Sequence, residues 1–338
     1  MKKIMVPLLF LVFLAPVISG QGNSYTGPYA KSKPIVVTRK SNRSISGLNI
    51  SNSKGNCITL SDCSDITIEN CKLGPAIGEG ISIRNCNNIV IRNCSMESIR
   101  TGVYAVASSG IKVVYNDVKN VKGPMPRGQM VQFDKVTGPG NSISHNKAEN
   151  ISGESSPEDV ISLFMSSGVD DDPIHVSGNQ IRGGGPSVSG GGIMAGDRGG
   201  SYILVENNIL VNPGQYGISV AGGHHITVRN NKIYAEKLPS NNVGLVAWNQ
   251  YKNIDCYAIT ISNNKINYTN SKGILNNMWN AQNMGPVAGW ETNKYSPELS
   301  GSILPQVLIA KYKSRVRNAT PPSKKHSHHK YHHRHRKR

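Results

Sequence analysis

A short apolar pattern recurs nine times along this chain and constrains its fold more than any other feature. Each copy consists of an apolar residue, two spacers, an anchor residue, one spacer and a second apolar residue. All eighteen positions that flank the anchors in this way are apolar. Such a repeat indicates one supersecondary unit stacked many times, which is a solenoid. The anchors are Leu48, Cys71, Cys94, Asn116, Asn146, Asn179, Asn208, Asn231 and Asn264.

Each repeat predicts short β-strands. The segments Ile58-Thr59-Leu60 and Ile66-Thr67-Ile68 alternate apolar and polar residues, and similar pairs recur in the following repeats. Alternation over so few residues is typical of strands, and no helical period lies between them. We therefore expect three short strands per turn, stacked in parallel at about 4.8 Å per turn. The asparagine anchors suit sharp corners with left-handed backbone and can form a hydrogen-bonded ladder along the axis.

Two repeats, HHITVRNNKI (224–233) and YAITISNNKI (257–266), resemble the standard unit of a known class. This class is the right-handed parallel β-helix of the pectate-lyase-like superfamily, and the resemblance covers about residues 35–270. It implies an all-β solenoid of about nine turns. It does not imply one activity, because the superfamily contains lyases, hydrolases, epimerases and proteins without known catalysis.

The ends of the chain differ in composition from the repeats. Residues 1–20 have two lysines, an apolar stretch and then small residues, which predicts a secretory signal peptide and no membrane span. Residues 21–310 form the predicted β-helix domain, in which residues 273–310 break the repeat and are expected to cap its end. The mature protein is therefore expected to be secreted, or to lie in a periplasm or at a cell surface.

The net charge of +18 comes mainly from a tail at residues 311–338, which is basic, rich in histidine and expected to be disordered. Without the tail and the signal lysines, 25 basic residues face 20 acidic ones. We therefore expect no nucleic-acid partner for the solenoid. The tail is expected to contact an anionic surface or to capture metal weakly, and a solvated, dispensable appendage is the alternative.

Four of the six cysteines follow the repeat. Cys71 and Cys94 share the anchor position, and Cys63 and Cys86 share another. Equivalent residues on neighbouring turns lie about 5 Å apart, a distance that permits a disulfide. A ladder of buried free thiols is the alternative. The spacing that a zinc site requires is absent.

The outward residues of the first strand predict a smooth wall. Ser162, Met194, Ser219 and Val246 are small or apolar, so we expect inserted loops, residues 273–310 or a ligand to cover them. Insertions concentrate in the middle turns, where a rigid scaffold can position functional loops. They fall at residues 119–130, 149–159, 165–173 and 182–192.

Titratable residues around this wall suggest a catalytic group for sugar cleavage. In this hypothesis Asp197 or Asp159 is the acid/base, Lys135 or Arg198 neutralises a uronate carboxylate, and His224 assists proton transfer. By strand register we expect Lys135 and Asp197 at equivalent places two turns apart. A role in pinning the glycine-rich loop at 183–192 is the alternative for Asp197 and Arg198.

Aromatic and acidic neighbours of the wall are candidate sugar-binding residues: Trp248, Tyr251 and Asp134. Trp279 and Trp290 fall in the predicted cap. No cofactor is required by this hypothesis, although calcium is a candidate because Asp170-Asp171-Asp172 groups carboxylates; a solvated acidic loop is the alternative. The leading hypothesis is a polysaccharide lyase or glycoside hydrolase. The alternative is a non-catalytic envelope or surface protein that binds glycan or another partner.

Overall fold

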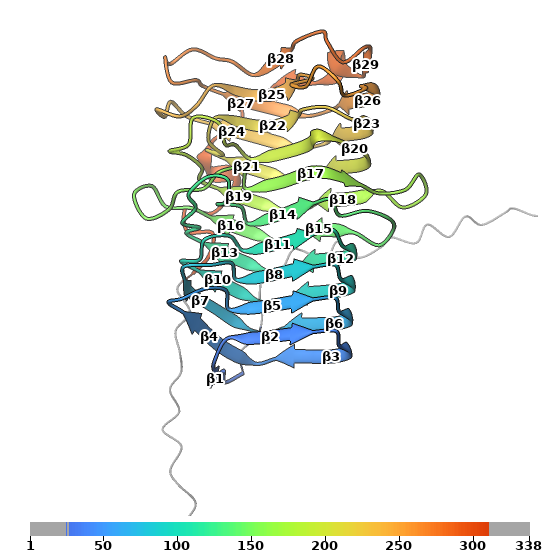
Figure 1. The fold of residues 1–338 in the computed structure, drawn as a ribbon. Coiled ribbons are helices and arrows are strands. Elements are labelled where there is room, and N and C mark those ends of the chain that lie inside the picture. The colour runs from blue at the N-terminus through green and yellow to red at the C-terminus, as the bar shows by residue number, and fades with distance from the viewer. Residues whose placement is uncertain (1–24, 26, 311–338) are drawn as a thin grey trace, which may run out of the picture.

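The computed structural model describes residue 25 and residues 27–310, so the predicted signal peptide and basic tail lie outside the described residues. Parallel strands stack turn upon turn into a prism (Figure 1). Each turn contributes three strands, as predicted, and these form three faces. We call these faces the first, second and third sheets, in the order in which the chain visits them.

The first sheet carries the strands that begin each turn: β2 (Ile35–Thr38), β5 (Ile58–Ser61), β8 (Ile81–Arg84), β11 (Val103–Val106), β14 (Val131–Asp134), β17 (Ile161–Ser167), β20 (Ile193–Glu206), β22 (Tyr216–Val220), β25 (Val243–Ala247) and β28 (Met278–Asn280). The second sheet follows: β3 (Ser41–Ser46), β6 (Ser64–Glu69), β9 (Asn87–Arg92), β12 (Ser109–Val114), β15 (Ser142–Ser144), β18 (Ile174–Ser177), the end of β20, β23 (His224–Arg229), β26 (Tyr257–Ser262) and β29 (Val287–Ala288). The long strand β20 runs from the first sheet into the second.

The third sheet completes each turn: β1 (Ala30–Ser32), β4 (Leu48–Asn52), β7 (Lys72–Ala76), β10 (Ser95–Glu97), β13 (Asp117–Lys119), β16 (Lys147–Glu149), β19 (Gln180–Arg182), β21 (Ile209–Val211), β24 (Lys232–Ala235), β27 (Lys265–Tyr268) and β30 (Lys294–Tyr295). Two short 3₁₀ helices, η1 (Trp290–Thr292) and η2 (Gly301–Ile303), lie near the C-terminal end. All eighteen apolar residues that flank the anchors are buried in one continuous core.

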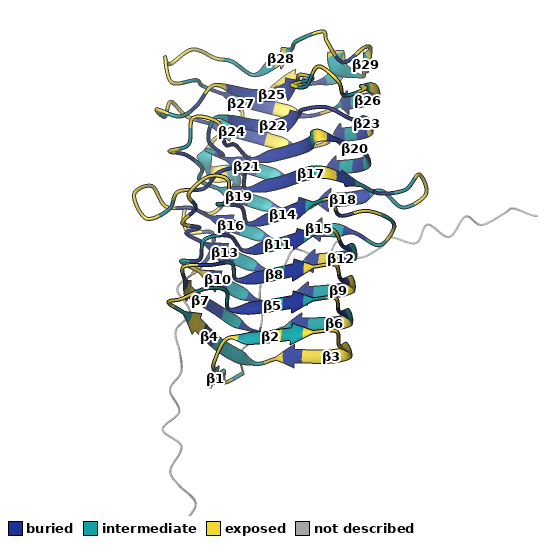
Figure 2. Cartoon of the chain, in the orientation of Figure 1, coloured by how far each residue is buried: buried dark blue, intermediate teal, exposed yellow. Residues whose placement is uncertain are grey.

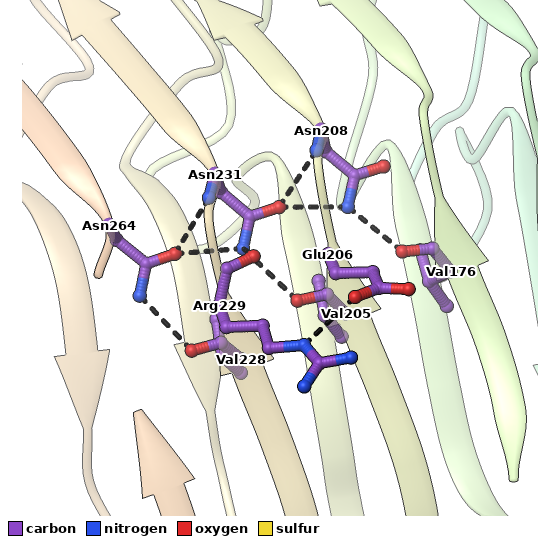
Figure 3. Close-up of polar contacts among 8 residues, drawn as sticks. All are labelled: Val176, Val205, Glu206, Asn208, Val228, Arg229, Asn231 and Asn264. Carbon is purple, nitrogen blue, oxygen red and sulfur yellow. Dashed lines mark hydrogen bonds and ion pairs between the residues drawn. The ribbon is translucent and has the colours of Figure 1, made fainter. Parts of the chain in front are cut away.

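The anchor asparagines form the predicted ladder (Figure 3). The side-chain amide of Asn208 donates to the Oδ1 atom of Asn231 at 3.0 Å, and the backbone N–H of Asn208 donates to the same oxygen at 2.9 Å. The pattern repeats from Asn116 to Asn264 and continues one turn further, to Asn293. Each rung is almost completely buried, so every amide must find its partners within the ladder.

The predicted left-handed backbone is displaced by one residue. The positive φ angles belong to the residues that precede the anchors, such as Tyr115 (φ 57), His145 (φ 58) and Asn230 (φ 57). The anchors themselves are therefore free to direct their side chains into the turn. In the first turns Cys71 and Cys94 take the anchor position, and all six cysteines are free thiols.

The repeat extends further than predicted. Strands β28, β29 and β30 pair with β25, β26 and β27, so part of the segment expected to form a cap adds one more turn. The chain then folds back along the third sheet as a C-terminal strap, residues 299–310. The buried carboxylate of Glu149 accepts hydrogen bonds from the backbone N–H groups of Leu308 (3.1 Å) and Ile309 (3.0 Å), and also pairs with Lys119 at 3.0 Å.

The ladder makes a stability prediction. Replacing Asn208 by alanine leaves the backbone N–H and side-chain amide of Asn179 without their acceptor in a buried site. We expect Asn208→Ala to lower the free energy of unfolding by about 2–4 kcal/mol, measured by urea unfolding followed by circular dichroism. The exposed neighbour Asn207 has φ 56, which glycine adopts readily, so Asn207→Gly should cost less than about 1 kcal/mol. Equal costs for the two variants would contradict a structural role of the ladder.

Candidate functional site

The predicted wall of the first sheet is covered by the protein itself. Ser162, Met194, Ser219 and Val246 are only 2–7% exposed. The apolar members pack in a separate cluster that includes the ring of Tyr216. Figure 2 shows β14 and β22 mostly in the colour of buried residues. A ligand therefore has no access to these four residues, and any site on this sheet must lie elsewhere.

The accessible part of the first sheet is a row of residues at the strand ends. Register makes its first five members cross-strand partners on consecutive turns, and the sixth directly follows β25. The outer two members are exposed and the others are half-buried. We call these residues the strand-end row: Arg84, Val106, Asp134, Phe164, Asp197 and Trp248.

Two acids of this row, Asp134 and Asp197, lie one turn before and one turn after Phe164. Asp134 pairs with Phe164, and Phe164 pairs with Asp197, so the two acids are two turns apart, about 10 Å between their backbones. The predicted equivalence of Asp197 with Lys135 is wrong. A register irregularity in the pairing of β17 with β20 moves Asp197 by one position, into line with Asp134. Lys135 is exposed and forms no ion pair within the described part of the chain.

A tyrosine hydroxyl holds each of these acids. The hydroxyl of Tyr251 donates to Oδ1 of Asp197, and the hydroxyl of Tyr104 donates to Oδ2 of Asp134 at 2.8 Å. The other oxygen of Asp134 is buried and has no hydrogen-bond partner among the residues that the structure describes. A buried carboxylate oxygen without a donor is unfavourable, and a bound hydroxyl or water molecule would relieve it.

Burial raises the pKa of the Asp197 carboxyl above its ordinary value. The Tyr251 hydrogen bond and the positive charge of Arg198 oppose this increase, and the negative charge of Asp134 adds to it. Asp197 therefore retains a proton at higher pH than an exposed aspartate does. Arg198, the next residue in the chain, is exposed and acts on Asp197 through its positive charge.

Asp159 lies at the opposite end of the strand, as predicted, but is enclosed. Its Oδ1 atom accepts hydrogen bonds from the backbone N–H of Gly191 at 3.0 Å and from the hydroxyl of Tyr216. Burial raises the pKa of Asp159 to about 7. Asp159 thus pins the glycine-rich loop, the role that sequence offered for Asp197 and Arg198. Asp197 instead pins the loop that contains Tyr251.

His224 does not join the acid group. It starts β23 in the second sheet, where its ring stacks on Tyr257 and its Nδ1 atom contacts Nδ1 of His225 at 2.8 Å. No hydrogen bond or ion pair among residues 27–310 connects His224 with Asp197 or Asp159. The predicted proton-transfer role has no geometric support in this arrangement.

Trp248 ends the strand-end row with an aromatic surface. It is 39% exposed and packs against Trp279, which is 45% exposed, with ring centroids 5.5 Å apart. Trp279 belongs to the additional turn and was expected only to cap the end. Tyr104 and Tyr216 were also missed as site residues. The outward position of Tyr104 in the strand alternation was an available signal, whereas Tyr216 has the parity of the inward residues Ile218 and Val220. Only three-dimensional contacts connect the two tyrosines with the acids.

The calcium prediction gains no support from the geometry. In the part of the chain that the structure describes, no three His, Cys, Asp or Glu side chains converge to hold a metal ion. Asp172 instead accepts a hydrogen bond from the backbone N–H of Gly140 at 2.8 Å. The described residues also contain no helix long and apolar enough to cross a membrane.

The family model described as "Right handed beta helix region" matches residues 34–185. This match, with the parallel stacking of the strands, confirms the predicted fold class, a right-handed parallel β-helix. A search of curated protein sequences finds no match.

The similar solved structures include two glucanase domains and a phage tailspike protein. The catalytic domain of a GH87 alpha-1,3-glucanase variant in complex with tetrasaccharides has a TM-score of 0.47 and 12% identity, over 80% of this chain and 61% of that one. A tailspike protein mutant of E. coli bacteriophage HK620 in complex with a pentasaccharide has a TM-score of 0.36 and 9% identity, over 78% of this chain and 60% of that one. The same type of glucanase domain with nigerose has a TM-score of 0.30 and 13% identity, over 83% and 70% of the two chains. The chain thus spans about three fifths of the first two structures.

The raised pKa of Asp159 predicts a pH dependence of stability. The unfolded chain releases this proton near pH 3.8, whereas the folded protein releases it near pH 7. Stability should therefore decrease as the pH rises from about 4 to about 7. Asp159→Asn cannot ionise, so its melting temperature should exceed that of the parent at pH 8, on the order of 5 °C, with no such gain at pH 4. The exposed Asp171→Asn serves as the control, and an unchanged pH profile in Asp159→Asn would contradict the assignment.

Proposed function

We propose that the protein is a secreted, carbohydrate-active β-helix protein that binds a polysaccharide along the strand-end row and hydrolyses it. The observation that carries this proposal is the pair Asp134 and Asp197, two turns apart on one accessible row with Phe164 between them. The two acids provide the reacting groups. The aromatic residues of the row provide surfaces for sugar rings.

Binding is supported by the composition of the row. A sugar ring has apolar faces and hydroxyl edges, so it suits aromatic side chains beside hydrogen-bonding groups. Phe164 lies between the acids, Trp248 lies two turns beyond Asp197, and Trp279 lies one turn further. The buried wall beside the row keeps these side chains in fixed positions.

The acid pair supports hydrolysis with inversion. An inverting glycosidase holds its carboxyl groups about 6.5–9.5 Å apart, so that a water molecule fits between one carboxylate and the sugar. A backbone separation of two turns, about 10 Å, is compatible with this requirement. Asp197, whose pKa is raised by burial, would protonate the leaving oxygen, and Asp134 would take a proton from water. Tyr251 and Tyr104 would orient the two groups.

A lyase is less compatible with this geometry. Lyase chemistry on a uronate requires a cation that neutralises the sugar carboxylate. Lys135 lies outside the register of the acids, and Arg198 is exposed beyond Asp197. The neighbouring acids would also repel a uronate. We therefore favour hydrolysis of a polysaccharide over elimination.

The first test replaces the acids. Asp197→Asn and Asp134→Asn should each lower the rate of polysaccharide hydrolysis by about 10²–10⁴-fold, because each removes one proton-transfer group. New reducing ends report hydrolysis, and nuclear magnetic resonance of the anomeric proton reports inversion. Glu206→Gln is the matched control, because Glu206 pairs with Arg229 on the second sheet. Activity that survives both Asp variants in folded protein would contradict the proposal, and ultraviolet-absorbing unsaturated products would indicate a lyase.

One observation favours a second candidate, a non-catalytic glycan-binding surface protein. Tyrosine hydroxyls already occupy one oxygen of each acid, whereas the Trp248 and Trp279 rings remain exposed. In this case the acids would serve only to fix loops. The predicted signal peptide and the basic tail, which we propose contacts an anionic surface, are compatible with both candidates.

A tryptophan variant tests binding in either case. Trp248→Ala removes an aromatic surface at the end of the row, and we expect glycan affinity to fall by about 10-fold or more. Affinity electrophoresis in polysaccharide gels measures this loss. Tyr295→Ala is the control, because Tyr295 is a similarly exposed aromatic residue on the third sheet. Equal affinity of parent and Trp248→Ala would remove Trp248 from the binding surface.

A further inference from the structure

A pair of adjacent histidines on the second sheet is brought together by the backbone of its turn. His224 and His225 begin β23, and their Nδ1 atoms lie 2.8 Å apart. In a regular strand, adjacent side chains point to opposite faces. The left-handed backbone of His225 (φ 52) interrupts this alternation and brings both rings together. His225 is exposed and His224 half-buried, so solvent ions reach the pair.

The position of His225 belongs to a column of left-handed residues that the fold itself sets. In the earlier turns the column contains Asn42 (φ 54), Asp65 (φ 54), Asn88 (φ 52), Gly110 (φ 62) and Gly140 (φ 78), which are residue types that adopt positive φ readily. In the turns before and after His225 it contains Tyr202 (φ 53) and Ala258 (φ 52). The left-handed backbone is therefore a property of the column, and the feature particular to this turn is that a second histidine precedes His225.

Tyrosine rings hold both imidazoles in place. Tyr202 stacks on His225 with centroids 4.8 Å apart and planes at 20°, and Tyr257 stacks on His224 at 4.6 Å and 9°. The two imidazoles are nearly perpendicular, at 82°. Each ring is thus fixed by a partner on its face, and the two Nδ1 atoms share one hydrogen bond, in which the N–H of one imidazole donates to the nitrogen of the other.

We propose that His224 and His225 together bind one divalent transition-metal ion of the copper(II) type through their Nδ1 atoms. Metal–imidazole bonds are about 2.0 Å long. Two such bonds at a right angle place the nitrogens about 2.8 Å apart, whereas a tetrahedral angle requires about 3.3 Å. The observed 2.8 Å, which is a hydrogen bond in the metal-free protein, lies within the span that one ion can bridge when it replaces the shared proton, and copper(II) binds imidazole most tightly among the divalent first-row ions.

The surroundings suit a partly open site. No further His, Cys, Asp or Glu ligand converges on the pair within residues 27–310, so water completes the coordination. A groove of about 670 Å³, lined by His225, Tyr257 and Asp170 among others, provides the space beside the pair.

The experiment uses the full chain with the tail histidines replaced by serine, because these would bind copper themselves. Isothermal titration with Cu(II) should show one site per chain, and electron paramagnetic resonance should show coupling to two nitrogens. His225→Asn keeps a residue type that the same column tolerates at Asn88, and should lower the affinity at least about tenfold. The replaced tail residues are His326, His328, His329, His332, His333 and His335.

His145→Asn is the matched control. His145 is also exposed, has φ 58 and stacks on a tyrosine, Tyr115, at 5.0 Å, but lacks a second histidine beside it. It should leave copper binding unchanged. Three results would overturn the proposal: unchanged affinity in His225→Asn, an equal loss in His145→Asn, or a copper signal coupled to a single nitrogen.

Discussion

Hydrogen bonding between neighbouring turns is the constraint on which the rest of this structure depends. Every strand satisfies its backbone groups on the turns before and after it, and the buried asparagines from Asn116 to Asn293 do the same with their side chains. Because each Oδ1 atom accepts both a backbone N–H and a side-chain amide, the turns cannot slide past one another. This fixed register allows residues separated by 30 or more positions, such as Asp134 and Asp197, to lie on one row.

The same constraint explains how much could be predicted from sequence. The apolar flanks, the alternating first strands and the ladder follow from local patterns, because each turn solves the same packing problem. The left-handed position was misplaced by one residue since asparagine occurs on both sides of the corner, as at Asn230 and Asn231. The additional turn was missed because Asn293 follows a 3₁₀ helix rather than an alternating strand.

The site was predictable only in part. Sequence identified Asp134, Asp159, Asp197, Trp248 and Tyr251, but placed Asp197 in register with Lys135. The error arises in the Ala195–Gly196 segment, where β20 contains one residue more than its partner β17 before Asp197. An insertion of one residue inside a strand leaves no compositional signature. The hydrogen bonds between the tyrosines and the acids could not be predicted either, because Tyr216 lies more than fifty residues from Asp159 and Tyr251 lies more than fifty residues from Asp197.

The C-terminal strap has a mechanical consequence. A solenoid in which each turn contacts only its neighbours can unravel from its free end, one turn at a time. Here the chain returns from the last turn to Glu149 near the middle of the prism, where its backbone is held in a buried site. A pulling force applied to the chain after Ile309 therefore acts on the hydrogen bonds to Glu149 before it acts on β30. The chain between Glu149 and Ile309 forms a loop that these hydrogen bonds close, so the later turns can separate from the solenoid only after the bonds break.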